Sequence, residues 1–402
     1  MATTELSSRM ARLRQVASFE PRPLRPGFSG REPFDWPAGL RANRQNILNQ
    51  AAEPFVGITT DGTSVPGLYA LGPTGVSTRP ILDTANALLA ALSPEQRTTL
   101  CFDISSDCWR SWSNISPFLV RHGLHFETLS EEHRELALDV LRASLSAAGY
   151  QTARDVMRLN HTIAELTGGF DELGEWMYWI SLFGTPSETE PWGWQIDGHH
   201  LIVNCLVLGD QLVMTPTFMG SEPVVADSGT FAGTSVFEAE EDRGYALMRS
   251  LSDEQQATAR IKAVQDGDLV AGAAADNIVV PAAGIRYADL STSQQALLLR
   301  VIQTYTGRIR PGHAELAFED VKRHLSDTTF AWIGPCDPVS PFYYRIHSPV
   351  ALIEFDHQRG VHLQNDVPTR AHIHTVVRTP NGNDYGKDLL RQHYAQAGHH
   401  RE

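Results

Sequence analysis

Residues Trp192–Asp210 have the sequence WGWQIDGHHLIVNCLVLGD, in which two adjacent histidines enter a run of large apolar residues. After Gly209-Asp210 the chain continues as Gln-Leu-Val-Met-Thr. This pattern predicts a β-hairpin with a tight turn at Gly209-Asp210. Because side chains of a strand alternate between its two faces, we expect His199 and His200 to point in opposite directions. At least one of the two imidazoles is then buried, and its ring nitrogens need partners.

The composition is that of a globular protein with a sizeable core, since 42% of the 402 residues are hydrophobic. A formal net charge of -14 and the lack of a basic run argue against nucleic acid or an anionic membrane as partner. No apolar stretch approaches the roughly 20 residues of a membrane helix, and no signal peptide is evident, so we expect a cytoplasmic location. The four scattered cysteines form no CxxC pair, which predicts neither a thiolate zinc site nor disulfides.

Two regions are expected along the chain. Residues 1–35 are rich in Arg, Pro and Gly and lack periodicity, which predicts an arm that lies on the surface or reaches a neighbouring subunit of a homodimer. Residues 36–402 contain no linker, and we expect a single α+β catalytic domain there. It should begin with a helix over residues 36–50 and a strand over residues 56–62.

Four Leu-Ser motifs mark predicted helix starts, with Ser93, Ser130, Ser252 and Ser291 as the N-cap residues. Three of the four have Gln at the N3 position, which completes a capping box. The sequences after the motifs do not match over a fixed period, so we expect no repeat architecture. Between the first two motifs, Trp109 and Trp112 flank an arginine, which indicates either core packing with a surface arginine, the interpretation we favour, or a cation–π wall for a substrate.

The last hundred residues predict four consecutive strands, over residues 330–333, 342–346, 350–357 and 370–378, and a closing helix over residues 387–395. Consecutive strands with short connections form an antiparallel sheet. We therefore expect an α+β fold in which helices surround a central antiparallel sheet, either open or closed like a barrel.

Polar residues share faces of the last two predicted strands. Glu354 and Asp356 share one face of the third strand, and His372, His374 and Arg378 share one face of the fourth. If the strands pair with these faces together, adding one histidine of the central pair produces a set of donors suited to a divalent ion such as Zn, Fe or Mn. The predicted metal ligands are His200, Glu354, His372 and His374.

His200 is preferred over His199 because it shares its face with Asn204 and lies deeper in the predicted strand. His199 would then orient a ligand or face the substrate. The alternative to a metal is an ion pair between Glu354 and Arg378, with the histidines only hydrogen-bonded in a polar interior. Glu354 favours the metal interpretation, because a glutamate in an apolar strand is costly to bury unless a metal ion or another cation pairs with it.

Several of these stretches resemble the uncharacterised family called domain of unknown function 3500. The resemblance lies in Phe183-Gly184-Thr185-Pro186-Ser187, the Trp-Gly-Trp-Gln and Gly-His-His-Leu stretch, Pro216-Thr217-Phe218-Met219-Gly220, the Ile-Glu-Phe strand, His-x-His and Asn383-Asp384-Tyr385-Gly386. It covers about residues 67–394 and implies a single-unit fold with a shared site. It also implies that the second histidine of the pair is the functional one, but it implies no activity.

The expected function is that of a metal-dependent enzyme acting on a small polar or carboxylated molecule. If the reaction is a hydrolysis, the ion activates a water molecule and Asp356 accepts its proton. Arg378 would bind an anionic group of the substrate, and His199 would lie beside the ligands or face the substrate. A mononuclear non-haem iron oxygenase, a metal-dependent lyase and a non-catalytic small-ligand binding protein are the alternatives. Walker, GxSxG and GxGxxG motifs are absent, which argues against nucleotide, serine-hydrolase and dinucleotide chemistry.

Overall fold

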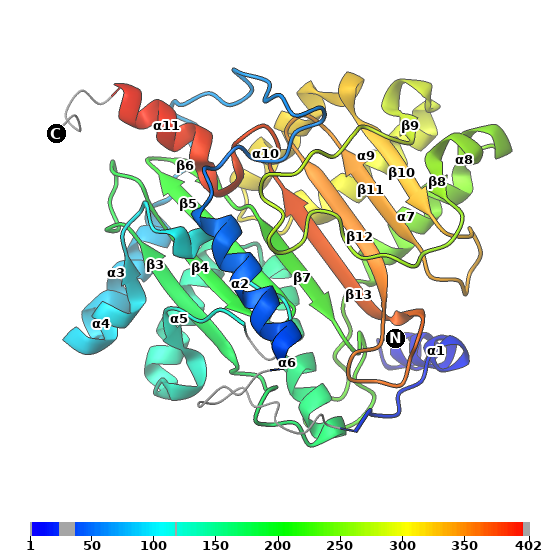
Figure 1. Ribbon diagram of the computed structural model, residues 1–402, viewed down its shortest axis with the longest axis horizontal. Helices are drawn as coiled ribbons and strands as arrows, with labels where there is room; N and C mark the ends of the chain where they lie inside the picture. The colour runs from blue at the N-terminus through cyan, green and yellow to red at the C-terminus, as the bar shows by residue number, and fades with distance from the viewer. Residues whose placement is uncertain (1, 24–36, 117–118, 397–402) are drawn as a thin grey trace.

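The computed structural model describes residues 2–23, 37–116 and 119–396. Within these residues the strands form one open 13-stranded sheet with helices around it, so the α+β prediction is confirmed (Figure 1). The sheet is not closed into a barrel. It is mixed rather than purely antiparallel, because the outer pairs β1 (Cys101–Phe102) with β3 (Tyr178–Phe183), and β8 (Arg260–Lys262) with β10 (Thr329–Ile333), are parallel.

The strands follow the order β1-β3-β4-β5-β7-β13-β12-β11-β10-β8, with β2 beside β3, β6 beside β5 and β9 beside β10. The remaining strands are β2 (Leu124–His125), β4 (Trp192–Gly198), β5 (Leu201–Leu208), β6 (Gln211–Val213), β7 (Thr217–Ser221), β9 (Ile285–Arg286), β11 (Tyr343–His347), β12 (Leu352–Arg359) and β13 (Pro368–Arg378). The predicted C-terminal strands are therefore confirmed as β10 to β13, and the predicted hairpin turn at Gly209-Asp210 joins β5 to β6.

The two halves of the sheet have the same connectivity. In the first half, α4 (Pro94–Leu100) leads into β1 and β2, then α5 (Glu131–Ser144) and α6 (Ala147–Thr167), and then β3, β4, β5 and β7. In the second half, α8 (Asp253–Ala259) leads into β8 and β9, then α9 (Thr292–Thr306) and α10 (His313–Arg323), and then β10 to β13. The halves meet where β7 and β13 pair antiparallel, with Met219 opposite Thr375.

This arrangement shows that the expectation of no repeat architecture is wrong. The four Leu-Ser motifs form two equivalent pairs, because Ser93 caps α4 and Ser252 caps α8, whereas Ser130 caps α5 and Ser291 caps α9. At each of the four helix starts, the serine hydroxyl accepts a hydrogen bond from the N3 backbone N–H. The duplication is not a fixed sequence period, because connections differ between the halves; β6, for example, has no counterpart after β12.

The N-terminal region differs from the predicted arm. Residues Ala2–Val16 form α1, whose Met10 and Leu13 are buried in the core, while residues 1 and 24–36 lie outside the described residues. Helix α2 (Ala38–Ala52) confirms the predicted helix, but residues 56–62 contain only an isolated bridge from Thr59 to Val279. The other helices are α3 (Arg79–Ala91), α7 (Glu238–Ser250) and α11 (Lys387–Gln396). None of the helices in the described ranges has the length and apolar character needed to cross a bilayer.

Apolar side chains cover both faces of the sheet. In Figure 1, α2 crosses in front of the sheet, whereas α7, α9 and α10 lie behind it. On the front face Trp109 stacks on Phe183 at a ring distance of 4.0 Å. The Trp109 ring also covers Gly193, where an added Cβ would lie 2.6 Å from the ring and 2.2 Å from the Cys205 carbonyl oxygen. The residue between the two tryptophans of the WGW stretch must therefore be glycine.

We predict that Gly193→Ala lowers the free energy of unfolding by about 1–3 kcal/mol, because the methyl group overpacks the contact with Trp109. Gly39→Ala is the matched control, since nothing lies within 4 Å of its added Cβ in α2. The control should change stability by less than about 1 kcal/mol, in the stabilising direction. Chemical denaturation of both variants measures the difference, and equal stability would contradict the packing argument.

Candidate metal centre

His199 and His200 form the two-residue turn between β4 and β5, where Gly198 pairs with Leu201. The prediction that both histidines lie within a strand is therefore wrong. His200 has a φ of 62°, in the left-handed region, and this turn conformation rather than strand alternation sets the direction of its side chain. Its backbone N–H donates to the Asn114 carbonyl at 3.2 Å, and its carbonyl accepts from the Gly220 N–H at 2.8 Å.

The structure brings His200 together with His372 and His374 of β13. The three Nε2 atoms form a nearly equilateral triangle, with separations of 3.2 Å (His200–His372), 3.1 Å (His200–His374) and 3.0 Å (His372–His374). All three side chains are buried. Gly220 of β7 lies opposite His374 and makes room for the rings, since an added Cβ would lie 2.8 Å from His374 Cδ2 and 3.4 Å from His200 Cδ2.

Hydrogen bonds cannot satisfy this triangle. Each Nε2 atom of a neutral imidazole is either a donor or an acceptor, so at least two of the three have the same character and cannot hydrogen-bond to each other. A divalent ion satisfies all three at once. Such an ion would be held by three protein ligands, which would leave coordination positions for further ligands.

A hydrogen bond at the opposite ring nitrogen fixes one of the imidazoles, that of His372. His372 Nδ1 donates to the Arg359 carbonyl at 2.7 Å, so its Nε2 carries the lone pair that faces the triangle. His374 Nδ1 lies 3.6 Å from Asp268 Oδ1, in an electrostatic contact longer than a hydrogen bond. Burial lowers the pKa of His372 to about 4 and holds the pKa of His200 well below its usual range. These two imidazoles are thus neutral at pH 7, as metal ligands must be.

His199 lies beside the triangle and is not part of it. Its ring stacks on the His200 ring at 3.9 Å, and its Nδ1 is 2.8 Å from Asn160 Oδ1. The His362 ring contacts it edge-on at 5.4 Å. The structure therefore places His199 where it supports the position of His200.

Glu354 does not join the histidines, and its assignment as a ligand is corrected. Its fully buried carboxylate accepts the backbone N–H groups of Val270 at 3.1 Å and Ala271 at 2.8 Å, and the Tyr343 hydroxyl. Burial raises its pKa, while these three donors favour the ionised form. Its partners belong to the segment 263–284 and to β11, which sequence spacing could not reveal.

Asp356 lies closer to the histidines than Glu354 does, because it is opposite His374 in the β12–β13 register. Asp268, Asp356 and His374 form a second group whose potential ligand atoms lie within 4.8 Å of one another. The Gln358 side-chain amide donates to both carboxylates. Asp356 is fully buried and its Oδ1 has no hydrogen-bond partner, whereas Asp268 is exposed.

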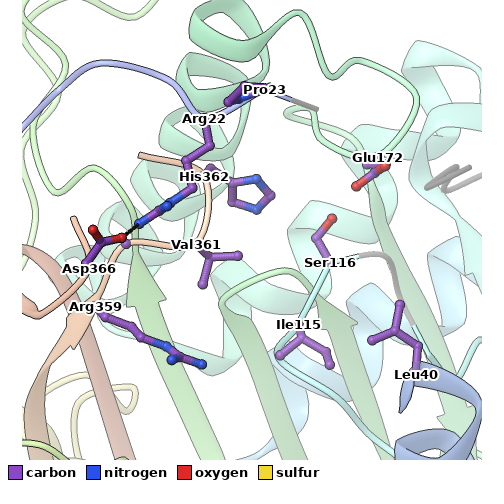
Figure 2. Close-up of a pocket in the computed structure, with 11 residues that line it drawn as sticks. Arg22, Pro23, Leu40, Ile115, Ser116, Glu172, Arg359, Val361, His362 and Asp366 are labelled. Atoms are coloured by element: carbon purple, nitrogen blue, oxygen red, sulfur yellow. Dashed lines mark hydrogen bonds and ion pairs between the residues drawn. The ribbon is translucent and has the colours of Figure 1, made fainter. Parts of the chain in front are cut away.

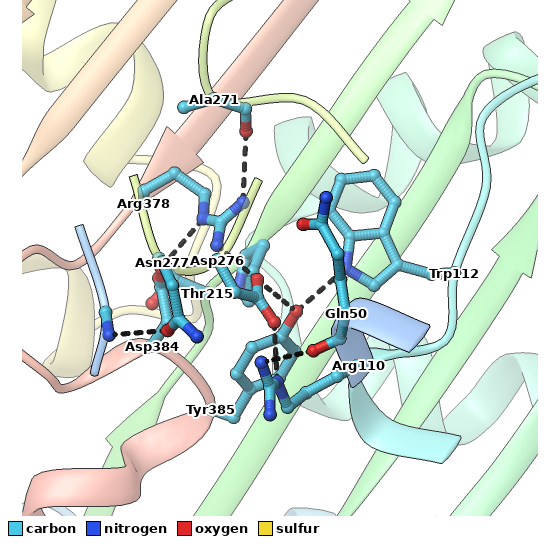
Figure 3. A network of polar contacts seen from close by, with 12 residues as sticks. Gln50, Arg110, Trp112, Thr215, Ala271, Asp276, Asn277, Arg378, Asp384 and Tyr385 are labelled. Carbon is cyan, nitrogen blue, oxygen red and sulfur yellow. Dashed lines mark hydrogen bonds and ion pairs between the residues drawn. The ribbon is translucent and has the colours of Figure 1, made fainter. Parts of the chain in front are cut away.

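Arg378 is not available to a substrate, which corrects its predicted role. Its fully buried guanidinium donates to Asp384 at 2.7 Å, to Asp276 at 2.6 Å and to the Ala271 carbonyl at 3.0 Å (Figure 3). The alternative ion pair between Glu354 and Arg378 is likewise not formed. Instead both residues hold the segment 263–284 against the front face of the sheet, where this segment carries Asp268 to His374.

Arg110 belongs to the same network and is not a surface arginine. It is buried, pairs with Asp276 at 2.7 Å and donates to carbonyl groups at the end of α2 (Figure 3). The Tyr385 hydroxyl donates to Asp276 and accepts from the Trp112 indole N–H. The Trp-Arg-Ser-Trp stretch is therefore core packing around a buried ion pair, and Arg110 does not line a cation–π wall.

Two cavities are lined by residues that contact the histidine triangle, although none of the three histidines lines either cavity. One, of about 410 Å³, is lined by Arg359 and His362, and the other, of about 250 Å³, is lined by Phe218 and Asp268. Ile115 lines both. The Phe218 ring contacts the His374 ring at 5.0 Å. Both cavities therefore reach residues that touch the triangle.

The sequence interpretation missed Gly220, Asp268, Arg359 and His362. Gly220 and Asp268 reach His374 only through the β7–β13 pairing and the fold of segment 263–284, so neither has a local signal. Arg359 lies just beyond the predicted third strand. The Arg359-Gly360 pair after this apolar strand indicates a turn, which is the one local signal near the site.

One comparison with known proteins found a match. The chain matches the family described as Protein of unknown function (DUF3500) over residues 74–387. The chain belongs to the DUF3500 family. The matched residues include all three histidines of the triangle and Asp268. Comparison with curated proteins and with solved structures produced no match.

We predict that Asp276→Ala lowers the free energy of unfolding by about 3–5 kcal/mol, because it leaves the buried Arg110 and Arg378 without a shared counter-charge. The matched control is Asp289→Ala, which removes an exposed ion pair with Arg286 and should leave stability unchanged. Thermal and urea unfolding measure both. Equal stability of the two variants would show that the network does not hold the segment 263–284.

Proposed function

We propose that this protein is a metal-dependent enzyme that acts on a small polar or carboxylated molecule. One divalent ion, Zn, Fe or Mn, would be held by His200, His372 and His374. The observation that carries the proposal is the triangle of Nε2 atoms 3.0–3.2 Å apart, which protein hydrogen bonds cannot satisfy. Three protein ligands would leave coordination positions for water and substrate, as in catalytic rather than structural zinc sites.

A hydrolytic reaction is the best supported. Three neutral imidazoles leave the positive charge of the ion uncompensated, which favours a low pKa for a bound water. Two carboxylates, Asp356 and Asp268, lie beside His374. We propose that one of them accepts the proton of this water, and Asp268 is the one that is exposed to solvent and can pass the proton on.

The geometry supports the iron oxygenase alternative less well, and a metal-dependent lyase stays an alternative. Many non-haem iron oxygenases use two histidines and one carboxylate, and Glu354 would have been that carboxylate. Its oxygens are instead used by backbone N–H groups and Tyr343. A non-catalytic binding protein is the other alternative. The cytoplasmic location and the homodimer stay predictions.

We predict that the purified protein binds about one divalent ion per chain, and that His200→Ala, His372→Ala and His374→Ala each remove it. His199→Ala is the matched control, because its ring stacks on His200 without facing the triangle, and this variant should retain the ion. Elemental analysis after anaerobic purification, with circular dichroism to confirm folding, measures this. Ion content unchanged in the three variants, or lost only in His199→Ala, would contradict the proposal.

The identity of the ion separates the candidate reactions. Zinc with oxygen-independent turnover is the expected result. Iron with oxygen-dependent turnover would replace hydrolysis by an oxygenase reaction. A folded wild-type chain that binds no metal after incubation with zinc, iron and manganese would favour the binding-protein alternative.

A further inference from the structure

The cavity of about 410 Å³ is lined in part by the last residue of β12, Arg359, and by the residues that follow it, 360–362 (Figure 2). Its volume falls in the range of about 300–1,000 Å³ that is typical of small-molecule sites. The residues that line it and enter the argument are Arg22, Ile115, Glu172, Arg359, His362 and Asp366.

Two contacts connect this cavity to the histidines. The carbonyl of Arg359 accepts the hydrogen bond from His372 Nδ1 at 2.7 Å. The His362 ring lies against His199, which in turn stacks on His200. The residues that line one wall of the cavity thus orient His372 directly and contact His200 through His199.

Backbone contacts hold this wall in place. The pairing of β12 with β13 shifts register between His357 and Arg359. At the next residue, Gly360, an added Cβ would lie 2.3 Å from the Leu363 carbonyl oxygen, so the turn requires glycine. The buried Glu222 carboxylate accepts the N–H groups of residues 361–363 at 3.0–3.1 Å. A wall held in this way is ordered before a ligand binds, which reduces the entropic cost of binding.

Some of the charged side chains that line the cavity have ion-pair or hydrogen-bond partners, whereas the Arg359 side chain has none among the described residues. Arg22 pairs with Asp366 at 2.8 Å, and Glu172 has a partner of its own. In the part of the chain that the structure describes, no hydrogen bond or ion pair involves the Arg359 guanidinium, which carries no dashed line in Figure 2. A guanidinium offers donors in a planar fork that matches a carboxylate or phosphate group.

We infer that this cavity binds the substrate, and that Arg359 binds an anionic group on it, a carboxylate or a phosphate. The inference rests on the proposed function, since it assigns the substrate class of that metal enzyme. Arg359 takes the role that the sequence suggested for Arg378, whose guanidinium is fully used by Asp276 and Asp384. The substrate is therefore a small anion whose charged end lies at Arg359, beside the cavity wall whose backbone holds His372.

Calorimetric titration of the full chain with succinate, citrate and inorganic phosphate tests this inference. We expect at least one of these anions to bind, and Arg359→Ala to bind it about tenfold to hundredfold more weakly, because a hydrogen-bonded charge is lost. Arg359→Lys should retain part of the affinity. The matched control is Arg300→Ala, which removes an exposed arginine of α9 and should bind like the wild type. The carboxylate and phosphate titrations distinguish the two kinds of anion.

Metal content measured on the same samples separates this inference from the proposed function. If Arg359→Ala keeps its metal but binds the anion more weakly than the wild type does, the inference is supported. Equal affinities of Arg359→Ala and Arg300→Ala, or no binding of any of the three anions to metal-loaded wild type, would overturn it while leaving the metal centre intact. Arg359-dependent anion binding in a chain that takes up no metal would support the anion site and overturn the metal-dependent function.

Discussion

The close approach of three imidazole nitrogens is the constraint on which the rest of the site depends. Nε2 atoms 3.0–3.2 Å apart, buried from water, are unfavourable unless a cation or protons lie between them. The surroundings hold the rings in this position: the left-handed turn at His200, the absence of a side chain at Gly220 and the carbonyl of Arg359 each fix one contact. Such support from surrounding residues is characteristic of metal centres.

The triangle lies at the junction of the two similar halves of the sheet. His200 comes from the β4–β5 turn of the first half, whereas His372 and His374 come from β13 of the second. The β7–β13 pairing sets their relative position, because it brings Gly220 opposite His374. Neither half contains the complete set of ligands, so the proposed activity requires both.

Local periodicity predicted those parts of the site that lie within regular strands. Alternation along β13 correctly placed His372 and His374 on one face, and the spacing of β12 placed Asp356 near them. His200 was selected for a wrong reason, since a two-residue turn and not a strand aims it. Glu354 was correctly expected to be buried with a partner, whereas Arg378 was expected to bind an anionic substrate group and is instead buried in an ion-pair network. Those partners come from segment 263–284 and from Asp384, and only the folded chain brings them close.

Anomalous X-ray diffraction from crystals of the metal-loaded protein tests the central claim most directly. Data collected at the zinc, iron and manganese absorption edges identify the ion and locate it. The account predicts one strong peak about 2.0–2.1 Å from the Nε2 atoms of His200, His372 and His374. A peak coordinated by Glu354, a peak held by Asp268 and Asp356 with none at the histidines, or no peak after loading with all three metals would contradict it.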